Sequence, residues 1–76
     1  MRITVKLYGD LKSQAPGDRT DFELNLDPGA TIGDVLRMLA IPEVHCVSLI
    51  NGQRAFQASR FENDDALVLF PPVCGG

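Results

Sequence analysis

The chain has 76 residues, of which 45% are hydrophobic and 22% charged, and its formal net charge is −3. This length allows one small domain, and the apolar content is too high for a disordered chain. A net negative charge without a basic stripe excludes a typical nucleic-acid binder. The longest apolar runs are about five residues, far short of the ~20 that a membrane-spanning helix needs, so we expect no membrane partner.

The N-terminal part of the chain predicts two half-buried strands. Residues 2–8 and 21–26 both alternate between apolar and polar side chains, which is typical of a strand with one face on a core. The inward positions are Ile3, Val5 and Leu7 in the first strand and Phe22, Leu24 and Leu26 in the second.

A loop over residues 9–20 is expected between these strands, because it contains two glycines, a proline and several polar residues. If the two strands pair as a hairpin, Lys6 is expected opposite Glu23 and Arg2 opposite Asp27. A long loop specifies this register only weakly.

The clearest helix signal follows the turn residues Asp27-Pro28-Gly29. Thr31 is a favourable N-cap, and Asp34 places a carboxylate in the first turn, as in a capping box. Pro42 is expected to end the helix at or before Ile41. The apolar stripe of this helix has the spacing i, i+3, i+4, i+7 and consists of Ile32, Val35, Leu36 and Leu39.

Three further strands are expected, the middle one short: residues 44–50, 53–55 and 66–70. Asn51-Gly52 is a strong signal for a tight hairpin turn between the first two of them. Phe56 and Phe61 are expected to tuck under the body of the domain, and Cys46 to be a small core residue.

This order of elements predicts an α+β domain with two layers, a mixed sheet of four to five strands covered by one main helix. The last strand, residues 66–70, carries apolar side chains on both of its faces, as expected at the centre of a sheet. The pattern fits a β-grasp (ubiquitin-like) fold, in which the first and last strands lie parallel in the middle. We therefore expect a β-grasp domain over residues 1–70 and an extended, flexible tail over residues 71–76.

The tail has the sequence Pro71-Pro72-Val73-Cys74-Gly75-Gly76. Prolines hold a chain extended, so the tail is expected to leave the body of the domain. Glycines lack Cβ and can thread a narrow slot in another protein. The working atom is then expected to be the terminal carboxylate of Gly76.

The two cysteines, Cys46 and Cys74, are expected to stay reduced in the cytoplasm, because a disulfide between them would tether the tail to the body. Cys74 is interpreted as a small, tolerated neighbour in the tail; the alternative is a redox or persulfide-relay role for an accessible thiol. No metal motif, P-loop or catalytic triad is found, and His45 is the sole histidine.

One helix can cover only one face of the sheet, yet the third and last strands carry apolar side chains on both faces. We therefore expect Val47, Leu49 and Phe70 to face outwards beside the tail as a partner-docking patch, with Phe70 as its aromatic anchor. The alternative is a strongly twisted sheet whose second face is covered by loops.

Three segments resemble the MoaD/ThiS family of ubiquitin-like sulfur carriers. Residues 63–76 are similar to the family's acidic turn, apolar strand, prolines and Gly-Gly ending, and the Pro-Pro-Val-x-Gly-Gly form is most like MoaD, the small subunit of molybdopterin synthase. Residues 27–36 resemble the family's turn and helix start, and residues 47–52 its strand and Asn-Gly hairpin. Cys74 stands where the family more often has Ser or Ala.

The resemblance implies a chain that is not catalytic alone. A ubiquitin-activating-like adenylyltransferase (MoaB, MoeB or ThiF type) would use ATP to adenylate Gly76, and a sulfur donor protein would supply the sulfur of a C-terminal thiocarboxylate. The resemblance implies that Pro71, Pro72, Val73 and Gly75 thread the tail into the active sites of the partners, with no cofactor bound permanently.

The acceptor implied for MoaD-type chains is a pterin bound by a molybdopterin synthase large subunit (MoaE-like). Two alternatives stay open beside this one: a carrier for thiamin or sulfur amino acid biosynthesis, and a ubiquitin-like protein modifier that ends in isopeptide bonds. A plain β-grasp adaptor without tail chemistry is a further alternative.

Overall fold

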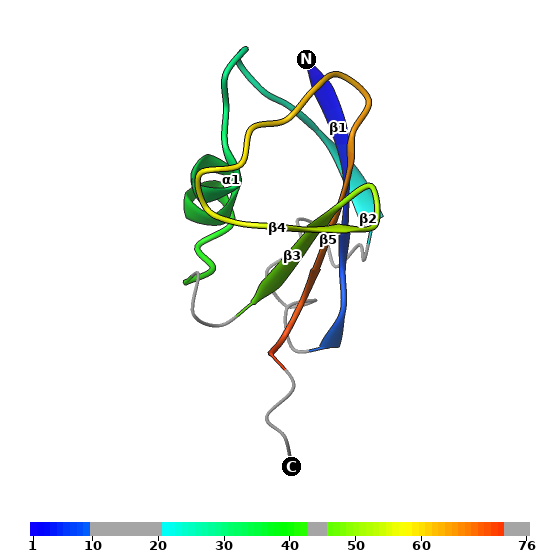
Figure 1. Ribbon diagram of the computed structural model, residues 1–76, viewed down its shortest axis with the longest axis vertical. Helices are drawn as coiled ribbons and strands as arrows, with labels where there is room; N and C mark the ends of the chain where they lie inside the picture. The colour runs from blue at the N-terminus through cyan, green and yellow to red at the C-terminus, as the bar shows by residue number, and fades with distance from the viewer. Residues whose placement is uncertain (10–20, 43–45, 73–76) are drawn as a thin grey trace.

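The computed structural model describes residues 1–9, 21–42 and 46–72. Five strands form one mixed sheet in the order β2-β1-β5-β3-β4, and helix α1 packs on one side of it (Figure 1). The elements are β1 Arg2–Leu7, β2 Asp21–Asn25, α1 Ile32–Met38, β3 Val47–Ile50, β4 Gln53–Ala55 and β5 Ala66–Phe70. Residues 44 and 45, with which the third strand was expected to begin, lie outside the described residues, and the second of them is His45.

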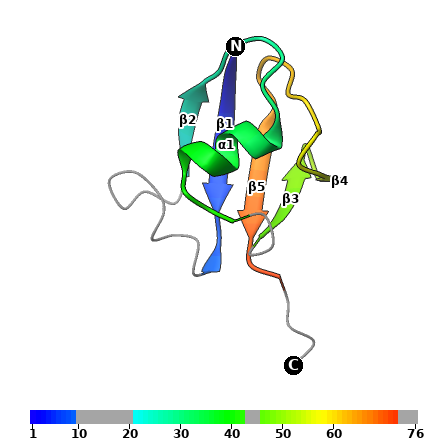
Figure 2. The ribbon, with the colours of Figure 1, turned by 90° about the vertical axis from the view of Figure 1, so that its left-hand side faces the viewer.

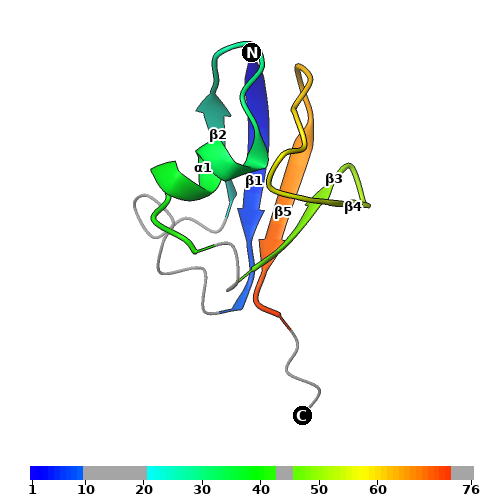
Figure 3. The same cartoon turned by 60° about the vertical axis from the view of Figure 1, so that its left-hand side comes forward.

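The first and last strands lie parallel at the centre of the sheet, as the sequence predicts. Val5 pairs with Leu67 and Leu7 with Leu69 along this central ladder. β2 lies antiparallel on the other side of β1, and β3 lies antiparallel on the other side of β5. The β3–β4 hairpin therefore stands beside β5 (Figure 3).

The register predicted for the first hairpin is wrong by two residues. Lys6 pairs with Asp21 rather than Glu23, and Arg2 pairs with Asn25 rather than Asp27. A slip of two keeps every side chain on its face, so the hydrophobic pattern does not distinguish the two registers.

Helix α1 crosses one face of the sheet (Figure 2) and begins at the predicted cap. The Asp34 N–H donates to Thr31 Oγ1 at 3.4 Å, and the Thr31 N–H donates to Asp34 Oδ2 at 3.0 Å, which completes a capping box. The next two backbone donors, of Ile32 and Gly33, reach the carbonyls of Ser59 and Gln57 at 3.0 and 2.9 Å. The loop before β5 thus satisfies helix N–H groups that have no partner inside the helix.

The core lies between α1 and the sheet face that it covers. The predicted inward residues of β1 and the predicted stripe of α1 are all buried, and residues from β4, β5 and the connections between the elements complete the cluster. Its members are Ile3, Val5, Leu7, Leu26, Ile32, Val35, Leu36, Leu39, Ile41, Ala55, Phe61, Leu67 and Leu69. Cys46 is half-buried and packs against this core.

The two phenylalanines between β4 and β5 differ in their environment. Phe61 is 5% exposed, as predicted, but Phe56 is 64% exposed, so the expectation that it tucks under the body is wrong. The Arg54 guanidinium lies 5.2 Å from the centre of the Phe56 ring and covers part of it instead.

The Asn51-Gly52 turn is tied to the start of β5. Both residues have positive φ, 52° and 84°, as this tight turn requires. Asn51 Oδ1 accepts from the Ala66 N–H at 2.9 Å, and Asn51 Nδ2 donates to Asp65 Oδ1 at 2.8 Å. The hairpin therefore helps to position the strand that leads into the tail.

The arrangement is an α+β, ubiquitin-like β-grasp fold, as the sequence predicts. Among the described residues there is no helix of the length and apolar character needed to cross a bilayer.

Candidate functional site

The tail leaves the sheet from its central strand. β5 ends at Phe70, at the end of the molecule opposite the N-terminus (Figure 1). The Tyr8 N–H donates to the Leu69 carbonyl at 3.0 Å and so extends the central ladder beyond β1. Pro71 is half-buried and Pro72 is exposed.

Pro71 packs against a glycine of the first connection. Gly9 has φ of 60°, and a Cβ on it would lie 2.7 Å from Pro71 Cγ. Real Cβ atoms essentially never approach this closely, so the bare backbone of Gly9 provides the space for the first tail proline. This contact holds Pro71 against the end of β1. We refer to Pro71 and Pro72 as the tail root.

The face of the sheet away from α1 carries an apolar stripe, which we name the open-face stripe. It consists of Val47, Leu49, Val68 and Phe70, which are all half-buried. Val47 pairs with Phe70 and Leu49 with Val68, while the alternate residues of β3 and β5 face the core. The structure thus brings Phe70, Leu49 and Val47 together beside the tail root; their role in docking stays a prediction.

Basic side chains flank this stripe on both sides. Lys6 on β1 pairs with Val68, and Arg54 on β4 pairs with Leu49. Lys6 Nζ lies 5.5 Å from the centre of the Tyr8 ring, an arrangement like that of Arg54 over Phe56.

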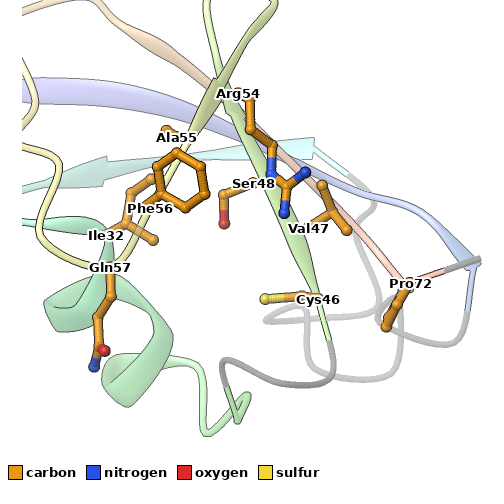
Figure 4. Close-up of a pocket in the computed structure, with 9 residues that line it drawn as sticks. All are labelled: Ile32, Cys46, Val47, Ser48, Arg54, Ala55, Phe56, Gln57 and Pro72. Carbon is orange, nitrogen blue, oxygen red and sulfur yellow. The ribbon is translucent and has the colours of Figure 1, made fainter.

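A pocket of about 270 Å³ opens at the β3–β4 side of the sheet and reaches the tail root (Figure 4). Its lining joins apolar side chains with a thiol, a hydroxyl, an amide and a guanidinium, and it consists of Ile32, Cys46, Val47, Ser48, Arg54, Ala55, Phe56, Gln57 and Pro72.

The rest of the predicted site, Val73, Cys74, Gly75 and Gly76, lies outside the described residues. Within residues 1–9, 21–42 and 46–72, no group of three or more His, Cys, Asp or Glu is placed to hold a metal ion.

Sequence reasoning missed three contributors to this region: Gly9, Lys6 and Arg54. The Pro71 contact of Gly9 joins residues far apart in the chain, so no local pattern reveals it. Lys6 alternates with apolar residues in β1, and Arg54 precedes the buried Ala55 in β4, but the position of both cations beside the stripe depends on the sheet order.

A β-grasp sheet whose central strand leads directly into a Pro-Pro exit defines a small protein of the ubiquitin-like class. A family model described as the ThiS family matches residues 5–76. The chain therefore belongs to the ThiS family.

Solved structures agree with this assignment. The chain is similar to SAMP1 from Haloferax volcanii, with 28% identity, full coverage of both chains and a TM-score of 0.79. A putative molybdopterin converting factor subunit 1 from Pyrococcus furiosus has 17% identity and a TM-score of 0.78, with 95% of this chain and 98% of that chain covered.

A third structure is the complex of subunits 1 and 2 of the molybdopterin-converting factor from Helicobacter pylori. It matches with 20% identity, full coverage of both chains and a TM-score of 0.66. At these identities the Pyrococcus and Helicobacter proteins show the shared fold alone. A comparison with curated protein sequences gave no significant match.

Proposed function

We propose that this chain is a sulfur carrier whose Gly76 carboxylate is adenylated and then converted to a thiocarboxylate. The observation that carries the proposal is the Pro-Pro-Val-Cys-Gly-Gly ending, joined to the central strand of a ThiS-family domain. The Gly9–Pro71 contact supports it, because this contact holds the first proline of the expected tail against the end of β1.

The chemistry explains why such a carrier needs partners. A carboxylate is a poor electrophile, so one of its oxygens attacks the α-phosphorus of ATP in the activating enzyme, and pyrophosphate leaves. Sulfur delivered by a donor protein at the sulfide level then attacks the acyl carbon, forms the carbon–sulfur bond of the thiocarboxylate and displaces AMP. The carrier contributes positioning and the reacting carboxyl group, and its partners contribute the catalytic groups.

Molybdopterin synthesis is the acceptor pathway that we propose first. The Pro-Pro-Val-x-Gly-Gly form of the tail resembles MoaD, and the fold matches that of two proteins described as molybdopterin converting factor subunits. The proposed partners are an adenylyltransferase, a sulfur donor protein and a large subunit of the MoaE type. The proposed compartment is the cytoplasm, where ATP and reduced sulfur are both present.

A protein modifier is the second candidate. Its support is the 28% identity to SAMP1, which a second structure describes as small archaeal modifier protein 1. In this case the adenylated Gly76 would be attacked by lysine amines, and the product would be an isopeptide bond.

The proposal is tested by pyrophosphate exchange. The chain is mixed with the purified ThiF/MoeB-type adenylyltransferase of its own host, ATP and labelled pyrophosphate. We expect carrier-dependent exchange with the full chain and with Cys74→Ser, and none when Gly75 and Gly76 are deleted. Exchange that survives the deletion would refute adenylation of the tail and favour an adaptor.

Phe70 is proposed as the aromatic anchor of partner binding, because it lies on the open-face stripe next to Pro71. Phe70→Ala should weaken binding to the adenylyltransferase about 10-fold or more, the loss expected for a truncated anchor. Since the side chain is half-buried, the domain should remain folded by circular dichroism.

Met38→Ala is the matched control for Phe70→Ala, because it removes a side chain that is 58% exposed on α1, away from the open-face stripe. An equal loss of affinity in the two variants, or unfolding of Phe70→Ala without a loss specific to binding, counts against the anchor.

A further inference from the structure

The β3–β4 turn contains the chain's single Asn-Gly pair, Asn51-Gly52, whereas Asn25 and Asn63 precede larger residues. In an Asn-Gly pair the backbone nitrogen of the glycine attacks the side-chain amide carbon of the asparagine. Glycine favours this attack because it has no Cβ to shield its nitrogen. Asn51 is exposed, so water reaches the turn as well. The turn therefore holds the reacting groups of a spontaneous deamidation.

This deamidation proceeds through a cyclic imide. The Gly52 nitrogen forms a bond to Asn51 Cγ and loses its proton, and the bond from Cγ to the amide nitrogen breaks with release of ammonia. Water then opens the imide at one of its two carbonyl carbons. The product has aspartate or isoaspartate in place of Asn51, and the reaction consumes only water.

In the folded chain, the side chain of Asn51 is held by the turn that precedes β5. Asn51 Nδ2 donates to Asp65 Oδ1 at 2.8 Å, and Asn51 Oδ1 accepts from the Ala66 N–H at 2.9 Å. The Asn51 N–H also donates to the Ala66 carbonyl at 2.8 Å. We name these three hydrogen bonds the Asn51 clasp. Since the clasp fixes the amide and binds the nitrogen that must leave, the reaction requires local opening of the clasp.

The carboxylate in the clasp is shielded and has few partners. Asp65 is 9% exposed, and its Oδ2 accepts from the Glu62 N–H at 2.8 Å. Arg54 and Arg60 line a surface pocket together with Asp65, but the ion pairs found in the described part of the chain do not include it. Asp65 Oδ1 therefore depends on the Asn51 amide for its hydrogen bond.

Deamidation replaces this hydrogen bond with repulsion. A carboxylate has no donor, so aspartate in place of Asn51 sets a second negative charge against Asp65. Partly buried charges are screened less by salt than exposed ones, so the repulsion persists at physiological ionic strength. The start of β5 at Ala66 then loses part of its attachment to the hairpin.

We propose that Asn51 is a self-modification site that the clasp keeps unreactive, and that its conversion to aspartate or isoaspartate releases the start of β5 from the β3–β4 hairpin. The modified chain then has a loosened central strand, and this strand leads into the tail root. The inference stands apart from the proposed function, because the reaction requires neither a partner nor the carboxylate of Gly76.

The first experiment measures deamidation of the full chain at mildly alkaline pH, in buffer and in urea. Mass spectrometry of proteolytic fragments gives the rates at Asn51, Asn25 and Asn63. In urea, we expect Asn51 to react faster than the other two. In buffer, the rate at Asn51 should be about 10-fold or more below its value in urea, because reaction waits for local opening.

Asp65→Ala tests the clasp, because it removes the acceptor of Asn51 Nδ2 and should raise the rate in buffer several-fold. Asn63→Ala is the matched control, since it removes a side chain that accepts from the Arg2 N–H at 2.9 Å without involving Asn51. The control should stay within about twofold of the wild type. Circular dichroism checks that both variants are folded.

Three results of this experiment would overturn the inference. Asn51 might react no faster than Asn25 and Asn63 in urea, its rate in buffer might equal that in urea, or folded Asp65→Ala might keep the wild-type rate. The first result removes the site, and the other two remove the clasp as its protection.

The second experiment tests the repulsion by exchange of the two side chains, and it does not depend on the folding of Asp65→Ala. Asn51→Asp mimics the aspartate product and should shift the unfolding equilibrium about 10-fold toward the unfolded state. Asp65→Asn alone should also destabilise the domain. In the double variant an amide again faces a carboxylate, and the Ala66 and Glu62 N–H groups keep acceptors, so most of the loss should be recovered.

Urea denaturation of the four chains gives the coupling between the two positions. Recovery in the double variant supports the proposed repulsion. Losses that simply add in the double variant, or wild-type stability of Asn51→Asp, would show that deamidation does not release β5 and would overturn the inference.

Discussion

Ala40 follows helix α1 in the left-handed region of backbone space, with φ of 58°. The Ile41 N–H donates to the Leu36 carbonyl at 2.9 Å and the Ala40 N–H to the Arg37 carbonyl at 3.2 Å. This pair of bonds is the Schellman motif, in which the left-handed position is usually glycine. Ala40 therefore adopts a conformation that its Cβ disfavours.

Ala40→Gly should raise the free energy of unfolding by about 0.5–1 kcal/mol, because the relief of the left-handed conformation exceeds the added entropy of the unfolded chain. Urea denaturation measures the change. Ala66→Gly is the control, since this exposed strand residue has no positive φ and the substitution should destabilise the domain. A loss of stability in Ala40→Gly would contradict the prediction.

Gly9 and Gly52 both have positive φ, but only Gly9 faces a close neighbour. Alanine at Gly52 meets nothing within 4 Å, whereas alanine at Gly9 meets Pro71. We expect Gly52→Ala to cost about 1–2 kcal/mol from backbone strain alone. Gly9→Ala should cost more and should also shift the NMR signals of Pro71. Equal costs and an unchanged Pro71 spectrum would show that the contact does not hold the tail root.

At the scale of the element, helix α1 has a pH-dependent start. The hydrogen bond from the Thr31 backbone, followed by that from Arg37, lowers the pKa of Asp34 below its ordinary value of 3.8. A lowered folded-state pKa means that the ionised carboxylate stabilises the folded chain. This contribution is present above 3.8 and is lost as the pH falls through the lower folded-state pKa.

Asp34→Asn should therefore be less stable than the parent at neutral pH, and the difference should shrink as the pH falls below 3.8. Urea denaturation at a series of pH values gives both curves. A difference that stays constant over the whole series would mean that the charge of Asp34 does not contribute to the cap.

Local signals predicted the helix well and the long-range pairings less well. The Thr31 cap and the apolar stripe of α1 depend on residues three or four apart, and both are confirmed. The β1–β2 register depends on a long connection, and the prediction was wrong by two residues. Phe56 was also predicted wrongly, because composition does not reveal that Arg54 covers its ring at the surface.

At the scale of the whole molecule, the parallel pairing of β1 and β5 determines where the tail emerges. β5 therefore ends opposite the N-terminus (Figure 1), and its last residue, Phe70, belongs to the open-face stripe. The outward position of Phe70 follows from the sequence, because β3 and β5 carry more apolar side chains than one helix can cover. The Gly9–Pro71 contact and the flanking cations required the three-dimensional register.

The central claim is that sulfur replaces an oxygen of the Gly76 carboxyl group, and the intact mass of the chain from its native host tests it most directly. We expect a species heavier than the unmodified chain by the difference between one sulfur and one oxygen, with fragmentation placing the change on Gly76. Chain recovered only unmodified, while the host's sulfur-dependent pathway is active, would contradict the account. Recovery as isopeptide conjugates alone would assign the chain to protein modification instead.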